Sequence, residues 1–175
     1  MIFHYRQRDI SSIIPTIKIG ETIIERVTDF NFLGLTIDEN MTWKAHTHKI
    51  TNKISRAIGV INSLKNTLPR SVLLTLYNSL ILPHLQYSIL CWGSYPGKVV
   101  TRQKQAIRLI SGNKYNSHTE PIFKKINMLN FNDTFKSCVL KFYYKLQNEN
   151  LPHYLQNMFK ASTTPGLGNY QFVLL

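Results

Sequence analysis

The sequence predicts an α+β fold, in which a small antiparallel hairpin and sheet edge precede a mostly α-helical bundle. Two observations support this prediction. Residues 16–37 contain runs of strand-forming residues that are interrupted by glycine. From Thr42 onward, apolar residues recur every three or four positions, which is the period of an α-helix. Of the 175 residues, 43% are hydrophobic and 17% are charged, so the chain can bury a core and is not disordered throughout.

The β part is expected to contain three strands. Residues 16–19 and 22–26 flank a Gly-Glu pair at 20–21, and two strand-forming runs around such a pair indicate a hairpin. Residues 30–37 are expected to form a single third strand. Gly34 inside this strand indicates a bulge or the close approach of another backbone. The buried side of the third strand is expected to consist of Phe30, Phe32 and Leu33.

The first helix is expected to begin near Thr42 and to end before Pro69. Its apolar face comprises Ile50, Ile54, Ala57, Ile61, Leu64 and Leu68. A second helix is expected over Arg70–Leu82, and Pro83 then kinks or interrupts it because proline has no backbone N–H to donate. An apolar helical piece follows over His84–Trp92. The buried face of the second helix is expected to contain Leu73, Leu76, Tyr77 and Leu80.

A third helix is expected over Thr101–Ile110, with Gly112 as its C-terminal stop. Thr119 is a good N-cap for a short helix over Glu120–Asn127. His84 and His118 are expected to be structural hydrogen-bonding residues.

The last long helix is expected over Thr134–Gln147, with Asn132 or Asp133 as its N-cap. Its buried stripe comprises Phe135, Val139, Phe142 and Leu146. Residues 151–159 are expected to add one more helical turn, and the Thr-, Gly- and Pro-rich residues 162–175 to form a loose tail.

The charge of the chain is strongly positive, because 21 Lys and Arg stand against 9 Asp and Glu, a net charge of +12. Such a charge favours contact with nucleic acid or another anionic surface through steering and counterion release. The main candidate surface is a stripe on the first helix: Lys44, Lys49, Lys53 and Arg56. A weaker patch on the third helix comprises Arg102, Lys104 and Arg108. The alternative interpretation of the net charge is a basic domain of a larger, more balanced protein. The alternative interpretation of the stripe is a solvated helix face.

Catalytic and metal chemistry receive no support from the sequence. Nucleotidyl transfer by two metals needs clustered carboxylates, and the adjacent acids Asp38 and Glu39 are expected to form a turn or to cap the following helix. His46 and His48 lie two positions apart on a helix, so they point to different faces and make a poor metal pair. No catalytic residue, metal ligand or cofactor is assigned.

Cys91 and Cys138 are the only cysteines, and their spacing matches no zinc site. Both are expected to be reduced core residues, and Trp43 and Trp92 to be core anchors rather than base-stacking platforms. The N-terminus lacks the apolar region of a signal peptide, and the most apolar run, Ser71–Leu90, is too interrupted for a membrane span. These features favour an intracellular protein, in the nucleus or cytoplasm, without a membrane partner.

Several short motifs follow one another along the chain. They are F-L-G-x-x-I-D at 32–38, T-W at 42–43, L-P at 68–69, T-L-Y-x-S-L-I-x-P at 75–83, C-W-G-S at 91–94, Q-K-Q-A-I-R-L-I at 103–110 and H-T-E-P-I-F at 118–123. In this order and spacing they resemble the C-terminal part of reverse transcriptases from non-LTR (LINE-like, jockey-type) retrotransposons. The resemblance covers residues 2 to 159.

The resemblance implies four segments. They are palm strands with a primer-grip-like hairpin (1–41), thumb-like helices (42–111), connection helices (112–160) and a flexible tail (161–175). The primer-grip-like residues are Phe32, Leu33 and Gly34. The implied partner is an RNA/DNA template–primer duplex, bound without sequence preference. The catalytic aspartates are expected to be missing, so the chain is expected to be a truncated piece without polymerase activity of its own, and Mg²⁺ belongs only to the complete enzyme.

Two rival interpretations stay open. In one, the chain is a small helical protein-interaction module, which docks on a partner or self-associates through the cut edge of the palm. In the other, it is a remnant that does not fold stably.

Overall fold

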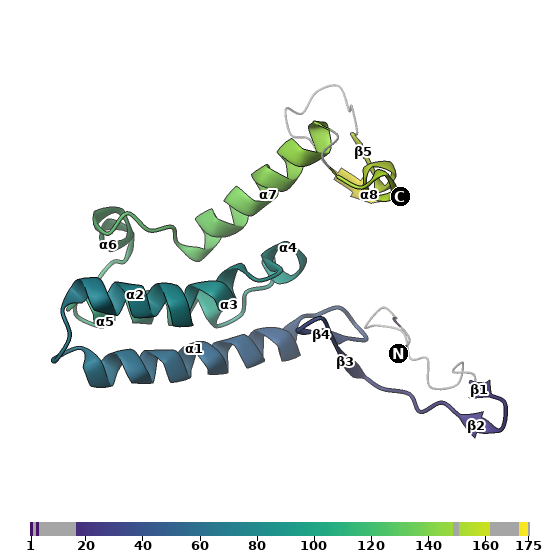
Figure 1. The fold of residues 1–175 in the computed structure, drawn as a ribbon, viewed down its shortest axis with the longest axis horizontal. Helices are drawn as coiled ribbons and strands as arrows, with labels where there is room; N and C mark the ends of the chain where they lie inside the picture. Colours follow the sequence, from purple (N-terminus) through teal and green to yellow (C-terminus); the bar gives the residue numbers. More distant parts are fainter. Residues whose placement is uncertain (2, 4–16, 149–150, 162–171, 175) are drawn as a thin grey trace. The chain divides into compact units, whose positions relative to one another are not determined.

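The structure is a computed structural model that describes residues 1, 3, 17–148, 151–161 and 172–174. The chain divides into two units, residues 1–134 and residues 135–175, each of which is described by itself. Short antiparallel hairpins precede a mostly helical part (Figure 1), which confirms the predicted α+β class. The segment boundaries predicted after residues 41, 111 and 160 stay predictions.

The first hairpin pairs β1 (Lys18–Ile19) with β2 (Thr22–Ile23) in antiparallel register. Gly20 has a φ of 58° in the connecting turn, a conformation that glycine adopts without a steric penalty. The predicted hairpin is therefore confirmed with shorter strands, although Thr16 lies outside the described residues.

The predicted single strand over 30–37 is wrong, because this segment is a second hairpin. β3 (Asp29–Phe32) pairs with β4 (Leu35–Asp38), so that Asn31 lies opposite Thr36. Leu33 and Gly34 form the two-residue turn, with φ values of 47° and 79°. Positive φ at both central residues is the geometry of a type I′ turn, whose twist matches the twist of the flanking strands.

The predicted buried side of this segment is also wrong. Phe30, Phe32 and Leu33 are exposed, by 53%, 54% and 74%, whereas Leu35 and Thr36 are buried. Successive side chains of a strand alternate between its two faces. Since the side chains of Asn31 and Thr36 hydrogen-bond to each other across the ladder, Phe30 and Phe32 lie on the opposite face of the hairpin.

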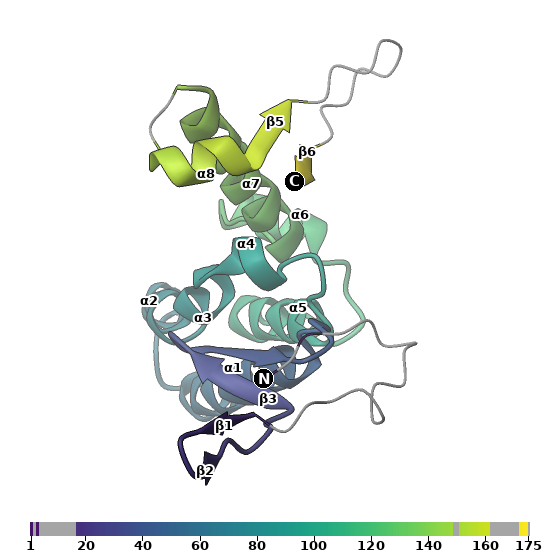
Figure 2. The ribbon, with the colours of Figure 1, turned by 90° about the vertical axis from the view of Figure 1, so that its right-hand side faces the viewer.

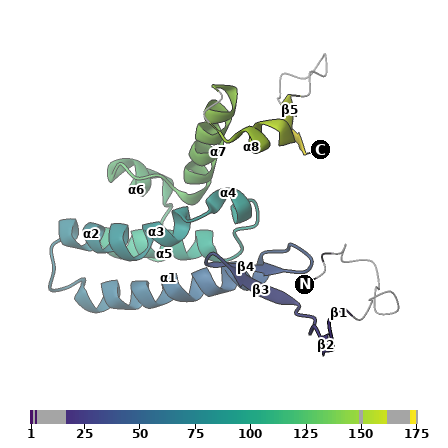
Figure 3. The same ribbon diagram turned by 45° about the vertical axis from the view of Figure 1, so that its right-hand side comes forward.

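Helix α1 (Lys44–Leu64) organises the helical part of the first unit. Most of the predicted apolar face is confirmed, since Ile50, Ile54, Ala57 and Ile61 are buried and α1 packs against α2 (Arg70–Leu80) and α5 (Val99–Ser111). The helix ends at Leu64, earlier than predicted, so that Leu68 lies beyond it, and both of these leucines are only half-buried. Figure 2 shows α2 and α5 next to each other above α1. The β3–β4 hairpin lies at the N-terminal end of α1, as Figure 3 shows.

The second predicted helix is shorter than expected and more exposed. α2 ends at Leu80, which is 37% exposed, while Leu73 and Tyr77 are buried and Leu76 is half-buried. The helical piece predicted over 84–92 is two short helices, α3 (Leu82–Gln86) and α4 (Ile89–Trp92). They are separated where Ser88 takes a φ of 48°, which a continuous right-handed helix cannot contain.

The later helices follow the prediction with shifted ends. Gly112 closes α5 in the left-handed conformation, as expected. α6 (Glu120–Lys125) begins after Thr119, but the Thr119 side chain makes no capping hydrogen bond. α7 (Phe131–Gln147) begins earlier than predicted, because Asn130 rather than Asn132 or Asp133 caps it. Its Oδ1 accepts from the Asp133 N–H at 2.9 Å.

In the second unit, α8 (His153–Met158) confirms the predicted extra turn. β5 (Phe159–Ala161) pairs antiparallel with β6 (Phe172–Leu174), and the rest of the predicted loose tail lies outside the described residues. The side chains predicted to form a buried stripe on α7 are only partly covered. Phe135, Phe142 and Leu146 are half-buried, and Val139 is 38% exposed.

The core of the first unit contains both tryptophans, as predicted, with Trp92 fully buried and Trp43 7% exposed. Trp92 packs against Phe131, with ring centroids 5.5 Å apart. The prediction for Cys91 is wrong, because this side chain is exposed, and Cys138 is half-buried. Cys91 lies on the four-residue helix α4, whose buried side is taken by Ile89 and Trp92.

Candidate nucleic-acid interface

The cations predicted on the first helix are all exposed: Lys44, Lys49, Lys53 and Arg56. They lie beside the buried face of α1, whose packing fixes the orientation of the helix and therefore of the cations. Two of these cations, Lys49 and Lys53, also line a pocket. Lys44 and Arg56 do not line it.

This pocket, called the hairpin pocket below, has a volume of about 210 Å³. It lies between the β3–β4 hairpin, α1 and the α3 region. Its lining residues are Asn31, Gly34, Thr36, His46, Lys49, Ile50, Lys53, His84 and Tyr87. Among these described residues none is acidic and only Ile50 is aliphatic, so the pocket suits a polar anion better than an apolar ligand.

A neutral amide, not a carboxylate, holds Lys49 in the pocket. The Lys49 Nζ donates to Asn31 Oδ1 at 3.0 Å, and Thr36 Oγ1 donates to the same oxygen at 2.8 Å. An amide oxygen orients an ammonium group without neutralising it. The positive charge of Lys49 is therefore positioned and still available to an anion.

Two histidines contribute to the same pocket. His46 is 4% exposed, and its Nδ1 accepts a hydrogen bond from the Thr36 N–H at 3.3 Å. This bond assigns the proton of the neutral ring to Nε2, and Nε2 has no hydrogen-bond partner among the described residues. Burial lowers the pKa of His46, and the nearby charges of Lys49 and Lys53 lower it further. Burial, followed by the charge of Lys53, also lowers the pKa of half-buried His84.

Tyr87 closes the pocket against the hairpin turn. Its hydroxyl donates to the backbone carbonyl of Leu33, and a Cβ added at Gly34 would lie 3.4 Å from the Tyr87 ring. The close approach predicted at Gly34 therefore exists, but it is made by a side chain and not by a backbone. Of the three residues that the resemblance predicts to be primer-grip-like, Gly34 lines the pocket, whereas Phe32 and Leu33 are exposed.

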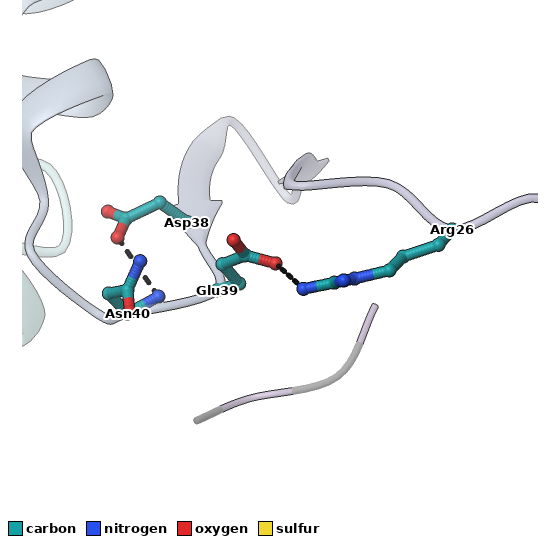
Figure 4. A network of polar contacts seen from close by, with 4 residues as sticks. All are labelled: Arg26, Asp38, Glu39 and Asn40. Carbon is teal, nitrogen blue, oxygen red and sulfur yellow. Dashed lines mark hydrogen bonds and ion pairs between the residues drawn. The ribbon is translucent and has the colours of Figure 1, made fainter. Parts of the chain in front are cut away.

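The segment between the hairpin and α1 is fixed by Asp38 and Glu39, which confirms their predicted structural role. The Asp38 carboxylate accepts from the backbone N–H groups of Thr42 and Trp43, both at 2.9 Å, and of Asn40 at 3.2 Å. Glu39 forms an ion pair with Arg26 at 2.7 Å. Figure 4 shows Asp38 turned toward Asn40 and Glu39 turned toward Arg26. These contacts set the direction in which α1 leaves the hairpin.

The cations predicted on α5 are not part of the hairpin pocket. Arg102 donates to Gln105 of its own helix at 2.8 Å. The Arg108 Nε donates to the Ser117 carbonyl at 2.8 Å, and its guanidinium lies 5.9 Å from the centre of the Tyr115 ring. Lys104 is exposed and lines a second pocket of about 230 Å³, together with His118. Arg108 therefore has a structural contact that a phosphate would have to compete with.

Sequence reasoning missed Asn31, His84 and Tyr87 as members of the site. Asn31 could have been noticed as a polar residue between two phenylalanines in a strand-forming run, although this is only a weak indication of a site. Tyr87 carried none, because it is 54 residues from Leu33, whose carbonyl it contacts.

Among the described residues, no group of three or more His, Cys, Asp or Glu side chains could hold a metal ion. None of the helices in the described ranges combines the length and the apolar character needed to cross a bilayer.

Comparison with known proteins shows similarity to RNA-directed DNA polymerases from the mobile element jockey. The chain is 21% identical over 141 residues to the polymerase of Drosophila funebris, covering 77% of this chain and 15% of that protein. It is 22% identical over 139 residues to the polymerase of Drosophila melanogaster, covering 75% of this chain and 15% of that protein. Most of this chain is thus related to a region that makes up a small part of these curated relatives. No protein-family model matches the chain, and no solved structure matches it.

Proposed function

We propose that this chain is the template–primer-binding part of a non-LTR retrotransposon reverse transcriptase and that it binds the phosphate backbone of an RNA/DNA duplex without sequence preference. The observation that carries this proposal is the hairpin pocket, where Lys49 and Lys53 stand together without an acidic residue among the described lining. The similarity to the jockey polymerases supports the same class of ligand.

The physical argument rests on charge that the fold leaves uncompensated. Lysine and arginine that contact phosphates release counterions, and log K then falls with log salt by about 0.9 per phosphate on a duplex. Lys49, Lys53 and Arg56 on one exposed face of α1 therefore predict a salt slope of up to roughly 2.7 from this stripe alone. Contacts of this kind position a duplex without reading its bases.

The test is the binding of a fluorescently labelled RNA–DNA hybrid, followed by anisotropy across a salt series. The variant Lys49→Ala/Lys53→Ala/Arg56→Ala should bind far more weakly and with a shallower salt slope. The matched control removes the same charge from exposed positions of the first unit outside the stripe: Lys65→Ala, Lys114→Ala and Lys124→Ala. No binding at low salt, or equal losses in both triple variants, would contradict the proposal.

A second candidate function, a protein-interaction module, is favoured by the exposed apolar side chains of the hairpins. Ile19, Ile23, Phe30 and Phe32 are each more than half exposed, and a large exposed apolar patch commonly marks a protein interface. Light scattering separates the two functions. An oligomer whose size does not change with salt and that does not bind nucleic acid favours the interaction module. A monomer that binds the hybrid favours the first proposal.

A further inference from the structure

We propose that the hairpin pocket is a discrete site for one phosphate group, which Lys49 and Lys53 bind together, so that these lysines do not track two successive phosphates along the helix. The inference rests on the proposed function in one respect, because a nucleic-acid backbone is then the source of the phosphate. Free inorganic phosphate has the same chemistry and is the second source.

The size of the site admits a bound phosphate. The volume of about 210 Å³ is well above the roughly 10–15 Å³ that a single water needs, so a phosphate group fits together with ordered waters. Lys49 and Lys53 are four residues apart on α1, a spacing that brings side chains next to each other on one helix face. Both line the same pocket, which makes them joint candidates for one anion.

The donors come from separate parts of the first unit. α1 supplies the two lysines, α3 supplies His84 and β3 supplies Asn31. The Asn31 Oδ1 is occupied by Lys49 and Thr36, so the group that Asn31 offers to an anion is its amide nitrogen, a hydrogen-bond donor. Charge-assisted hydrogen bonds of lysine to phosphate are about twice as strong as neutral ones.

The second observation is the Nε2 of His46. This buried N–H belongs to a residue of the pocket lining and lacks an acceptor among the described residues. A buried donor without a partner is unfavourable, because it loses its hydrogen bond to water and gains none in return. A phosphate oxygen, or a water that the phosphate orders, would supply the missing acceptor.

The titratable side chains that line the pocket are Lys49, Lys53, His46, His84 and Tyr87, and the β3–β4 hairpin contributes only the uncharged Asn31, Gly34 and Thr36. None of these described residues carries a carboxylate, so protonation of either histidine adds positive charge without forming an internal ion pair. Phosphate bound here should therefore raise the pKa of both histidines, because an opposite charge favours their protonated form.

The first arm of the test uses the full chain and inorganic phosphate. The ring signals of His46 and His84 are followed by NMR while phosphate replaces chloride at constant ionic strength. Saturable changes in these signals are expected, and the variant Lys49→Gln/Lys53→Gln should lose them. The control Lys65→Gln/Lys124→Gln carries the same charge change at exposed positions outside the pocket and should keep them. No saturable change, or equal changes in both variants, would overturn the inference.

The second arm uses the RNA–DNA hybrid and distinguishes one shared phosphate from two separate ones. If the lysines share a phosphate, either single substitution removes most of the effect, and the double variant lowers the salt slope by about 0.9. If each lysine contacts its own phosphate, the effects add and the slope falls by about 1.8. Additive losses would overturn the shared site. Spectra of the backbone amides check that each variant is folded.

The two proposals fail in different ways. If the hybrid binds with a steep salt slope but phosphate leaves the histidine signals unchanged, the pocket inference falls and the proposed function stands. If phosphate binds saturably in the pocket but the hybrid does not bind at low salt, the proposed function falls and the pocket remains an anion site.

Discussion

The replacement Gln103→Leu tests whether one buried amide holds the first unit together. Gln103 is 1% exposed on α5. Its Nε2 donates to the Tyr77 hydroxyl at 3.0 Å and to the Leu129 carbonyl at 3.3 Å, and its Oε1 accepts from the Phe131 N–H at 2.7 Å. One side chain therefore joins α5 to α2 and to the start of α7.

The expected loss of stability follows from the groups that the change leaves behind. The Phe131 N–H would be buried without an acceptor, which costs about 1–3 kcal/mol. Tyr77 is fully buried, and its hydroxyl would lose its partner, which costs about 1 kcal/mol more. The leucine side chain is apolar and offsets part of this. We expect a net loss of about 1–3 kcal/mol in the free energy of unfolding.

The assay is urea unfolding, followed by far-UV circular dichroism and tryptophan fluorescence. The control Gln105→Leu makes the same replacement two residues along the helix, at a half-buried position, and should change stability by about 0.5 kcal/mol or less. Adding Tyr77→Phe to Gln103→Leu should recover part of the loss, because the stranded hydroxyl is removed. Equal effects of Gln103→Leu and Gln105→Leu, or strictly additive losses in the double variant, would refute the reasoning.

Three further predictions concern the pocket and the whole chain. The pKa of His46 is lowered in the fold from 6.5, so the unfolded chain binds the proton more tightly and stability should fall as the pH drops below about 6.5. His46→Asn, whose Oδ1 can replace Nδ1 as the acceptor from Thr36, should flatten this dependence in thermal melts, whereas the exposed control His48→Asn should not. Gly34→Ala places a Cβ at a φ of 79° and against Tyr87, and should cost about 1–2 kcal/mol in urea unfolding. Primer extension with magnesium and a primed RNA template should yield no product, and any template-dependent product would contradict the assignment as a binding part alone.

The helices α1 and α5 were predictable because their signals are local. The spacing of Ile50, Ile54 and Ile61 reports the buried face of α1, and Gly112 marks the end of α5. The hairpin at 29–38 was not predicted, because its turn is Leu33-Gly34 rather than the usual Asn-Gly or Asp-Gly. With a leucine at the first turn position, the segment has the strand-forming composition of one uninterrupted strand.

The candidate site was half predictable. The helical spacing of Lys49 and Lys53 placed them on one face of α1, but spacing alone does not distinguish a solvated stripe from the wall of a pocket. That distinction depends on Asn31 and Tyr87, which approach the lysines only through the tertiary fold. Gln103 was missed for a similar reason, since its three partners lie 26 to 28 residues away.

The contact between Tyr87 and the Leu33 carbonyl closes the hairpin pocket, whereas the positive charge of the stripe belongs to α1 alone. A synthetic peptide copying Lys44–Leu64 would carry every cation of the stripe, yet it would have neither the hairpin nor the tyrosine that close the pocket. Such a peptide should still be attracted to any polyanion through long-range electrostatics. Holding a phosphate in one place should require the chain from the hairpin through α3, so attraction and placement can be measured as two separable properties of the same sequence.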